Sequence, residues 1–323
     1  MRCIALVLIL FFSLQVHAKD LTGIFDQYYQ SEKSIKASDI QNLSDTEIIL
    51  VPGVLSEVFS GEVLDLSRFT SQYFGDQVDY FKGLGLKVTR LPSSTYSVAK
   101  TKKLIHLAME EVIKENKKVL FITHSLGGLA LLDYLFENPI TARAHLRGII
   151  FLQSPFYGAP VASVFLSNPF YLKTLLEPVF PFFNFSEETI KYLSLEYRSG
   201  FMSMIQPQID DLSNMVPIVT VAGIVNGSPS LFLPGSELVE HGCVLNAFGR
   251  CLTPKLYKGP NDLSDGLVPL KSSKLVGVDY IELQGVDHAE VIVNVPFTTY
   301  KRKKLTEALM RVFFDKINGV ITL

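Results

Sequence analysis

The fold is decided by residues 119–136, which read Val-Leu-Phe-Ile-Thr-His-Ser-Leu-Gly-Gly-Leu-Ala-Leu-Leu-Asp-Tyr-Leu-Phe. The apolar run 119–122 predicts a short buried strand, and the apolar run 129–136 predicts a buried helix. Ser125 lies in the turn between them, and Gly127 lets the helix pack close to the strand. A serine in such a unit exposes its Oγ at the carboxyl edge of a sheet, where the first amides of the helix point towards it. The stretch therefore predicts a nucleophilic serine on an α/β sheet.

The turn around Ser125 resembles the nucleophile elbow of α/β-hydrolases, and residues 123–128 are similar to the elbow of lipases and esterases. One position differs, because Thr123 stands where the G-x-S-x-G pattern has its first glycine. The resemblance implies an α/β-hydrolase fold, with a mostly parallel central sheet flanked by helices and a helical cap insertion. It also implies that Ser125 is the nucleophile. The alternative is that Ser125 only caps the helix that follows it.

Apolar runs alternate with amphipathic helical patterns along the rest of the chain. Strands rich in Val, Ile and Leu that alternate with helices predict a parallel sheet covered on both faces. We expect one domain over residues 47–323, with an N-terminal arm over 19–46, a cap inserted at about 161–215 and a loop-like stretch at 224–264. The expected strands are 47–52, 87–92, 119–122, 148–153, 217–223 and 279–284, and the expected helices are 69–84, 97–116, 126–136 and 299–317.

A serine nucleophile needs a base that an acid holds in place, and this fold supplies them in the chain order Ser, acid, His. His288 follows the last expected strand, where the fold delivers its base. Asp265 precedes Gly266 in a turn that resembles the acid turn of lipases and related acyl hydrolases. We therefore expect His288 as the base and Asp265 as the acid, with Asp262 as the fallback and Asp287 as a poorer candidate. The alternatives are a surface histidine and an ordinary Asp-Gly hairpin turn.

Acyl transfer also needs backbone donors aimed at the oxyanion. The amide of Leu126, directly after the nucleophile, is the first expected donor. The second should come from the loop after the first strand, where lipases commonly have His-Gly-x and this chain has Pro52 in place of the histidine. We expect Val54 to donate there, and Leu55 is the alternative. Pro52, together with residues 154–160, resembles the lecithin:cholesterol acyltransferase group.

The expected cap is rich in aromatic residues. Seven of the residues from 165 to 185 are phenylalanine or tyrosine, and only two are charged. An insertion of this composition over the site would line an acyl-chain groove or meet a lipid surface. We expect Phe182 and Phe183 of the cap, and Phe156 near it, to contact the substrate. The alternative is that such aromatic side chains only pack the cap against the sheet.

Residues 1–18 have the layout of a cleavable secretory signal, with a basic residue, the apolar run 3–14 and small or aliphatic residues up to Ala18. The apolar run is shorter than the roughly 20 residues that span a bilayer. We expect cleavage near Ala18 and export to the periplasm or the outside, and an uncleaved anchor is the alternative. Cys243 and Cys251 would then form a disulfide in an oxidising compartment, and two unpaired thiols are the alternative.

Composition and charge exclude several classes of protein. The chain has 323 residues, of which 48% are hydrophobic, so it is not intrinsically disordered. A formal net charge of −2 argues against nucleic-acid binding, which depends on a cationic surface. The sequence has no dinucleotide loop, phosphate-binding loop or His-Glu-x-x-His motif, so we expect no cofactor and no metal.

Together these features predict a secreted serine hydrolase of carboxylic esters, which acts on a lipid or another ester and transiently contacts a lipid surface. The alternative enzyme is a phospholipase or lipid acyltransferase with the same triad of Ser125, Asp265 and His288. A non-catalytic lipid-binding protein on this fold is the alternative from another class, since a fold does not prove catalysis. Thr123 is the one local feature that favours it.

Overall fold

The structure is a computed structural model of the chain. It describes residues 18–54, 56, 72–92, 97–138, 143–167, 186–225, 227, 230, 232–244, 250–251, 255–259, 262–294 and 298–321. The expected signal sequence, apart from Ala18, lies outside the described residues, and so do Phe182 and Phe183. Within the described ranges, no helix is both long enough and apolar enough to span a membrane.

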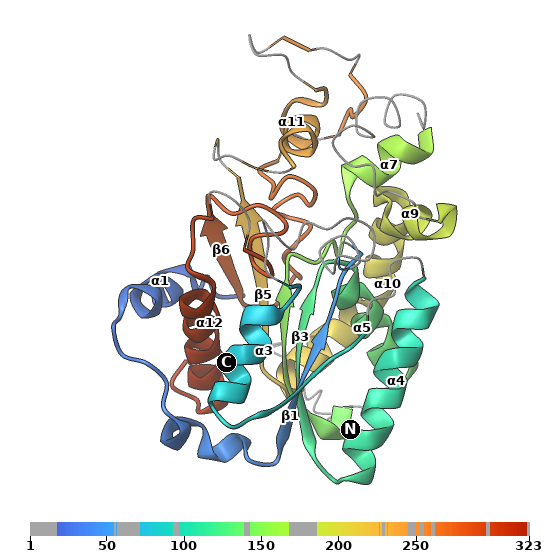
Figure 1. Cartoon of the computed structure of the whole chain (residues 1–323). Coiled ribbons are helices and arrows are strands. Elements are labelled where there is room, and N and C mark those ends of the chain that lie inside the picture. Colours follow the sequence, from blue (N-terminus) through green and yellow to red (C-terminus); the bar gives the residue numbers. More distant parts are fainter. Residues whose placement is uncertain are drawn as a thin grey trace, which may run out of the picture.

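Six strands in the described part of the chain form one parallel sheet, in the order β2-β1-β3-β4-β5-β6 (Figure 1). The chain moves outward from β1 to β2 and then returns to β3 on the other side of β1. In open parallel sheets, ligands bind at the carboxyl ends of the strands beside such a switch point. This sheet confirms the predicted α/β class with a mostly parallel sheet. The bounds of the strands are β1 Thr46–Val51, β2 Lys87–Arg90, β3 Lys118–His124, β4 Leu146–Leu152, β5 Ile218–Ile224 and β6 Tyr280–Gln284.

Helices cover both faces of this sheet. Connections between parallel strands are right-handed, and the chain reverses direction after β2, so α3 lies on the opposite face from α4 and α5. Helix α12 packs beside α3, and α1 packs on α12. The bounds of these helices are α1 Thr22–Gln30, the 3₁₀ helix η1 Ala37–Leu43, α3 Gly75–Gly83, α4 Val98–Lys114, α5 Leu126–Glu137 and α12 Arg302–Ile317.

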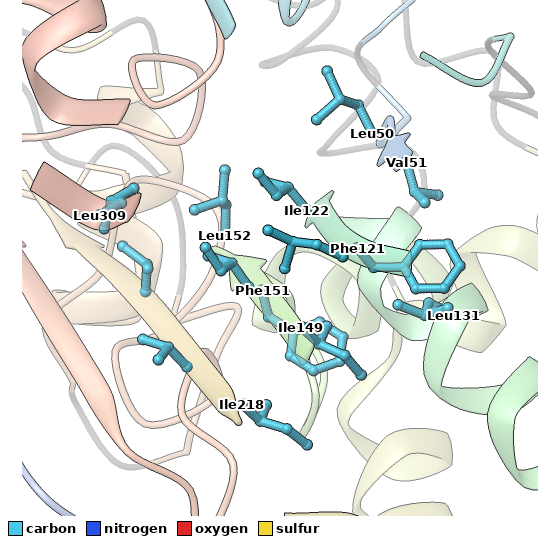
Figure 2. Close-up of a cluster of buried hydrophobic side chains, with 14 of the residues drawn as sticks. Leu50, Val51, Phe121, Ile122, Leu131, Ile149, Phe151, Leu152, Ile218 and Leu309 are labelled. Atoms are coloured by element: carbon cyan, nitrogen blue, oxygen red, sulfur yellow. The ribbon is translucent and has the colours of Figure 1, made fainter. Parts of the chain in front are cut away.

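The core lies between the sheet and its helices. Figure 2 shows Phe121 and Ile149 on neighbouring strands, with Leu131 of α5 and Leu309 of α12 on either side of the sheet. Strands β1 and β5 are buried along their whole length, as expected for strands covered on both faces. Burying one such aliphatic or aromatic side chain contributes about 1.5–3 kcal/mol. The core therefore fixes the sheet whose carboxyl edge carries the site.

The first residues of the expected N-terminal arm, 19–46, lie against the β6 edge of the sheet, whereas its last residue, Thr46, begins β1. Asp20 forms an isolated parallel bridge with Tyr280 of β6, and the Leu21 amide donates to the Tyr280 carbonyl. The contact covers part of an edge strand that would otherwise expose unpaired backbone groups.

Further helices lie at the end of the sheet towards which the strand arrows point (Figure 1). Of the range expected as the cap, α7 Pro160–Ser167 and α9 Glu187–Leu193 lie there. Helix α10 Leu195–Met215 instead runs back along the sheet to the start of β5 and packs into the core. The interpretation of 224–264 as loop is wrong in one part, because α11 Leu233–His241 forms there. This helix has Pro234 in its first turn and ends at Gly242, which has a φ of 76°. Proline near the start and glycine just past the end are ordinary helix boundary signals that could have located α11.

Candidate active site

Ser125 lies in a strained turn between β3 and α5. Its φ is 54° and its ψ is −128°, a conformation that L-residues rarely adopt. Its amide donates to the Leu152 carbonyl at 2.9 Å, which ties the turn to the end of β4. On the other side, a Cβ on Gly127 would lie only 2.5 Å from the Val51 carbonyl oxygen, so the helix approaches β1 closely because this residue is glycine. The elbow predicted from the sequence is therefore present.

The structure brings Ser125, His288 and Asp265 together in hydrogen-bonding geometry. The Oγ of Ser125 lies 2.9 Å from Nε2 of His288, and Nδ1 of His288 lies 2.8 Å from Oδ2 of Asp265. A carboxylate can only accept, so Nδ1 donates to it, and Nε2 of the neutral ring is left to accept from the serine hydroxyl. All three side chains are buried. The arrangement can remove the proton from Ser125 as its oxygen attacks a carbonyl carbon.

The Asp265 carboxylate is held by its own turn. Its second oxygen, Oδ1, accepts the amides of Leu267 at 3.0 Å and Val268 at 2.8 Å. The backbone carbonyl of Asp265 accepts the His288 amide at 2.9 Å. Gly266 has a φ of 97°, which explains the glycine after the acid. The turn and the histidine loop are thus joined by both a side-chain and a backbone hydrogen bond.

The two other acids considered from the sequence hold their own loops. The carboxylate of Asp262 accepts the amides of Leu263 and Lys271 in exposed hydrogen bonds. Oδ1 of Asp287 accepts the amides of Ala289 and Glu290, on the turn that follows. Asp265 is thus the acid that the structure places against the imidazole.

The loop after β1 lies beside the nucleophile. A Cβ on Gly53 would lie 2.7 Å from the Cβ of Ser125, so only glycine permits this approach. In the described part of the chain, the amides of Val54 and Leu126 donate no hydrogen bond to another residue. The Gly53 carbonyl accepts the Ser56 hydroxyl at 2.8 Å and the Ser56 amide at 3.3 Å. Two unpaired amides beside an activated hydroxyl are the donors that an oxyanion hole requires.

Solved structures of an esterase and a lipase share the fold of this chain. A metagenomic carboxyl esterase superposes with a TM-score of 0.61 and 19% identity, covering 86% of this chain and 77% of its own. The mature form of a Bacillus licheniformis lipase superposes with a TM-score of 0.54 and 16% identity, covering 84% of this chain and 91% of its own. This chain has the α/β-hydrolase fold. Protein-family models and curated protein sequences give no match to it. The narrower resemblance to lecithin:cholesterol acyltransferases stays a prediction.

The residues next to the elbow include two that the sequence analysis does not assign to the site. Neither His124 nor Tyr73 carries a sequence signal that predicts a role in the site. Nδ1 of His124 lies 2.5 Å from the Tyr73 hydroxyl, and Nε2 lies 2.8 Å from the carbonyl oxygen of His288. Burial lowers the pKa of His124 well below its ordinary value, with a further contribution from the nearby His288 ring. The His124 ring is therefore neutral.

Thr123, the departure from the glycine pattern, is accommodated in this fold. It pairs with Val51 and Phe151 on the neighbouring strands, and its side chain is fully buried. Its hydroxyl has no hydrogen-bond partner among the described residues. The hydrogen bond between Ser125 and His288 is present with threonine at this position, so Thr123 does not displace Ser125 from the imidazole.

Phe156 lies in the core. Its ring packs edge-on against Phe151 with centroids 5.1 Å apart, and it is 0% exposed. Its carbonyl accepts Nε of Arg198 at 3.1 Å. These contacts give Phe156 a packing role, and its contact with a substrate stays a prediction, as do those of Phe182 and Phe183.

A buried ion pair joins the range expected as the cap to α5, the helix after Ser125. Nη1 of Arg198, on α10, lies 3.8 Å from Oδ1 of Asp133, on α5. The Tyr192 hydroxyl of α9 donates to Oδ2 of Asp133 at 2.6 Å. Burial raises the pKa of the Asp133 carboxyl despite the nearby guanidinium. Helices α9 and α10 are thus anchored directly to α5, which follows Ser125.

The predicted disulfide between Cys243 and Cys251 is confirmed, with Cα atoms 5.7 Å apart. It closes a loop just after α11. Among the residues that the structure describes, no group of three or more His, Cys, Asp or Glu side chains is arranged to hold a metal ion.

Proposed function

We propose that this protein is a serine hydrolase that cleaves carboxylic esters, with Ser125 as the nucleophile, His288 as the general base and Asp265 as the orienting acid. One observation carries the proposal, the unbroken hydrogen-bonded series from Ser125 Oγ through the His288 ring to the Asp265 carboxylate. A serine that only capped a helix would need neither the His288 imidazole nor the Asp265 carboxylate beside it. The serine of this chain makes no side-chain capping bond to α5.

The geometry supports a two-step acyl transfer. Ser125 attacks the ester carbonyl carbon while His288 takes its proton, and the tetrahedral oxyanion is held by the amides of Leu126 and Val54. His288 then protonates the departing alcohol, leaving an acyl-enzyme, and a water activated by the same imidazole releases the acid. Asp265 keeps the ring in the correct tautomer and stabilises its cation. Each oxyanion donor of this kind contributes about 3 kcal/mol to transition-state stabilisation.

A lipid ester is the substrate class we propose. The fold neighbours named above are a carboxyl esterase and a lipase. The aromatic segment from 165 to 185 belongs to the cap that we propose for residues 161–215, and helices α7 and α9 of that range lie at the carboxyl end of the sheet (Figure 1). Such a segment suits an acyl chain and transient contact with a lipid surface.

We also propose that the enzyme works outside the cytoplasm. The Cys243–Cys251 disulfide supports an oxidising compartment, in which such bonds persist. The signal-like segment over residues 1–18 would direct the chain there and leave a hydrolase domain over 47–323 preceded by the arm 19–46.

The direct test is hydrolysis of p-nitrophenyl esters, from acetate to palmitate, by purified mature protein. Ser125→Ala should lower kcat by about 10³-fold or more. Ser273→Ala is a matched control, because Ser273 is buried and its hydroxyl has no partner among the described residues. Equal activity of both variants would refute the role of Ser125. A kcat/KM that falls as the acyl chain lengthens would refute the lipid substrate and keep the esterase.

A further inference from the structure

Two buried side chains that the reaction above does not use, Tyr73 and His124, connect the loops on either side of Ser125. The Tyr73 hydroxyl oxygen lies 2.9 Å from the Gly53 amide nitrogen and 2.5 Å from Nδ1 of His124. Nε2 of His124 lies 2.8 Å from the carbonyl oxygen of His288. A continuous series of hydrogen bonds therefore runs behind the nucleophile, from the loop after β1 to the loop that carries the base.

The direction of every hydrogen bond in this series follows from the groups involved. The His288 carbonyl can only accept, so Nε2 of His124 carries the proton and donates to it. Nδ1 of the neutral ring must then accept, and the Tyr73 hydroxyl donates to it. The tyrosine oxygen in turn accepts from the Gly53 amide. All three bonds point the same way, an arrangement in which each bond polarises and strengthens the next.

Tyr73 is itself held from several sides. Its ring lies edge-on to Phe74, with centroids 5.2 Å apart, and edge-on to His124 at 5.7 Å. Its carbonyl accepts Nη1 of Arg90, at the end of β2, at 2.8 Å. The next amide, that of Phe74, donates to the Ile292 carbonyl in the loop after β6. The hydroxyl is therefore presented from a fixed position.

Both peptide units at Gly53 are fixed as a result. Tyr73 holds the preceding unit through the Gly53 amide, and Ser56 holds the following one through the Gly53 carbonyl. In a trans peptide, the amide of Val54 points opposite to that carbonyl. Tyr73 and Ser56 together thus set the direction of the amide that we assign to the oxyanion hole.

The geometry points to Tyr73 and His124 as positioning residues that hold the Val54 amide and the His288 imidazole in register with Ser125. This role rests on the proposed function, since it concerns the alignment of groups that act in that reaction. The two residues act through others, because the Tyr73 hydroxyl is occupied by Gly53 and His124. Oxyanion contacts strengthen as charge develops, so misalignment should lower kcat and leave KM nearly unchanged.

The test compares Tyr73→Phe with Tyr80→Phe in ester hydrolysis by the full mature chain. Tyr80 is a matched control, because it is also buried and its hydroxyl has no partner among the described residues. Tyr73→Phe should lower kcat about 10- to 100-fold, with KM within about threefold of the wild type. Tyr80→Phe should have the same kcat and the same KM as the wild type. A kcat of Tyr73→Phe equal to that of Tyr80→Phe would overturn the proposal.

A spectroscopic readout separates alignment from a general loss of folding. In protein labelled with ¹⁵N-histidine, the Nδ1 resonance of His124 should shift in Tyr73→Phe and stay in place in Tyr80→Phe. His124→Gln keeps an N–H donor for the His288 carbonyl, so it should retain more of kcat than His124→Ala. No difference between these two variants would count against the His124 end of the series. Wild-type protein that hydrolyses no ester would refute the proposed function itself, an outcome distinct from an unaffected Tyr73→Phe.

Discussion

Oδ2 of Asp265 lies 2.8 Å from Nδ1 of His288, while the other oxygen of the same carboxylate is held by two backbone amides. The position of the carboxylate is thus fixed by its own turn, independently of the imidazole. Asp265→Asn should lower kcat by about 10³- to 10⁴-fold, because the amide no longer selects the ring tautomer that accepts the serine proton. The measurement is kcat for a soluble ester under saturating substrate.

Asp262→Asn is the control for that variant. Asp262 lies three residues earlier, and its carboxylate holds two amides of its own loop at the surface. Its kcat should stay within about twofold of the wild type, since surface changes of this kind are nearly neutral. A comparable loss in both variants would show that Asp265 acts through the stability of the turn.

The close approach of α5 to β1 predicts a strong effect of one methyl group. In Gly127→Ala the new Cβ would lie 2.5 Å from the Val51 carbonyl oxygen and 2.6 Å from that of Pro52. Both neighbours are backbone, so we expect a loss of about 3 kcal/mol in the free energy of unfolding. Gly200→Ala, inside α10 where a Cβ meets nothing within 4 Å, should instead stabilise the protein by about 0.5–1 kcal/mol. Denaturant titration of both variants checks the contrast, and two changes of the same sign would contradict it.

The buried pair of Arg198 and Asp133 predicts energetic coupling between the cap region and the elbow helix. Removing one partner leaves a buried charge without its counter-ion, so Asp133→Asn and Arg198→Met should each destabilise the protein by about 3 kcal/mol. The double variant removes both charges and should be less destabilised than the sum of the two, by about 1–3 kcal/mol. Denaturant unfolding of the four proteins completes the cycle. Additive changes would mean that the 3.8 Å contact carries no coupling.

The neutral, buried His124 predicts a contribution to acid sensitivity. In the unfolded chain, the His124 imidazole binds a proton below its ordinary pKa of 6.5. In the folded chain, burial lowers the pKa of this imidazole well below that value. Unfolding therefore takes up one proton, and the free energy of unfolding falls by about 1.4 kcal/mol per pH unit below 6.5 from this group alone. His124→Gln lacks this contribution. The stability difference between wild type and variant should shrink as the pH falls from 6.5, and a constant difference would contradict the prediction.

Much of the candidate site could be predicted from the sequence because its three residues follow the chain order that this fold uses. Ser125 is marked by the strand–turn–helix pattern, and Asp265 and His288 follow in the order that an α/β sheet imposes. The parallel sheet could be predicted for the same reason, since buried strands such as β3 are continuous apolar runs. For the three site residues and for the sheet alike, the local sequence pattern predicts the position that the structure shows.

The parts that could not be predicted depend on contacts between distant segments. Tyr73 meets His124 across 51 residues, and nothing in its surrounding sequence indicates a buried polar role. In the sequence, Arg198 resembles any charged residue on the surface of a helix. In the structure it is 0% exposed and forms an ion pair with Asp133 of α5. Helix α11 escapes prediction for a different reason, because the proline and glycine at its ends are equally typical of loops.

The most direct test of the central claim is the reaction of the folded mature protein with a fluorophosphonate probe, followed by location of the adduct by peptide mass. An activated serine beside a general base attacks such a probe, whereas ordinary serines do not. The account predicts one adduct, at Ser125, which is absent in Ser125→Ala and present in Ser273→Ala. Folded protein that carries no adduct, or carries it on another serine, would contradict the assignment of Ser125 as the nucleophile.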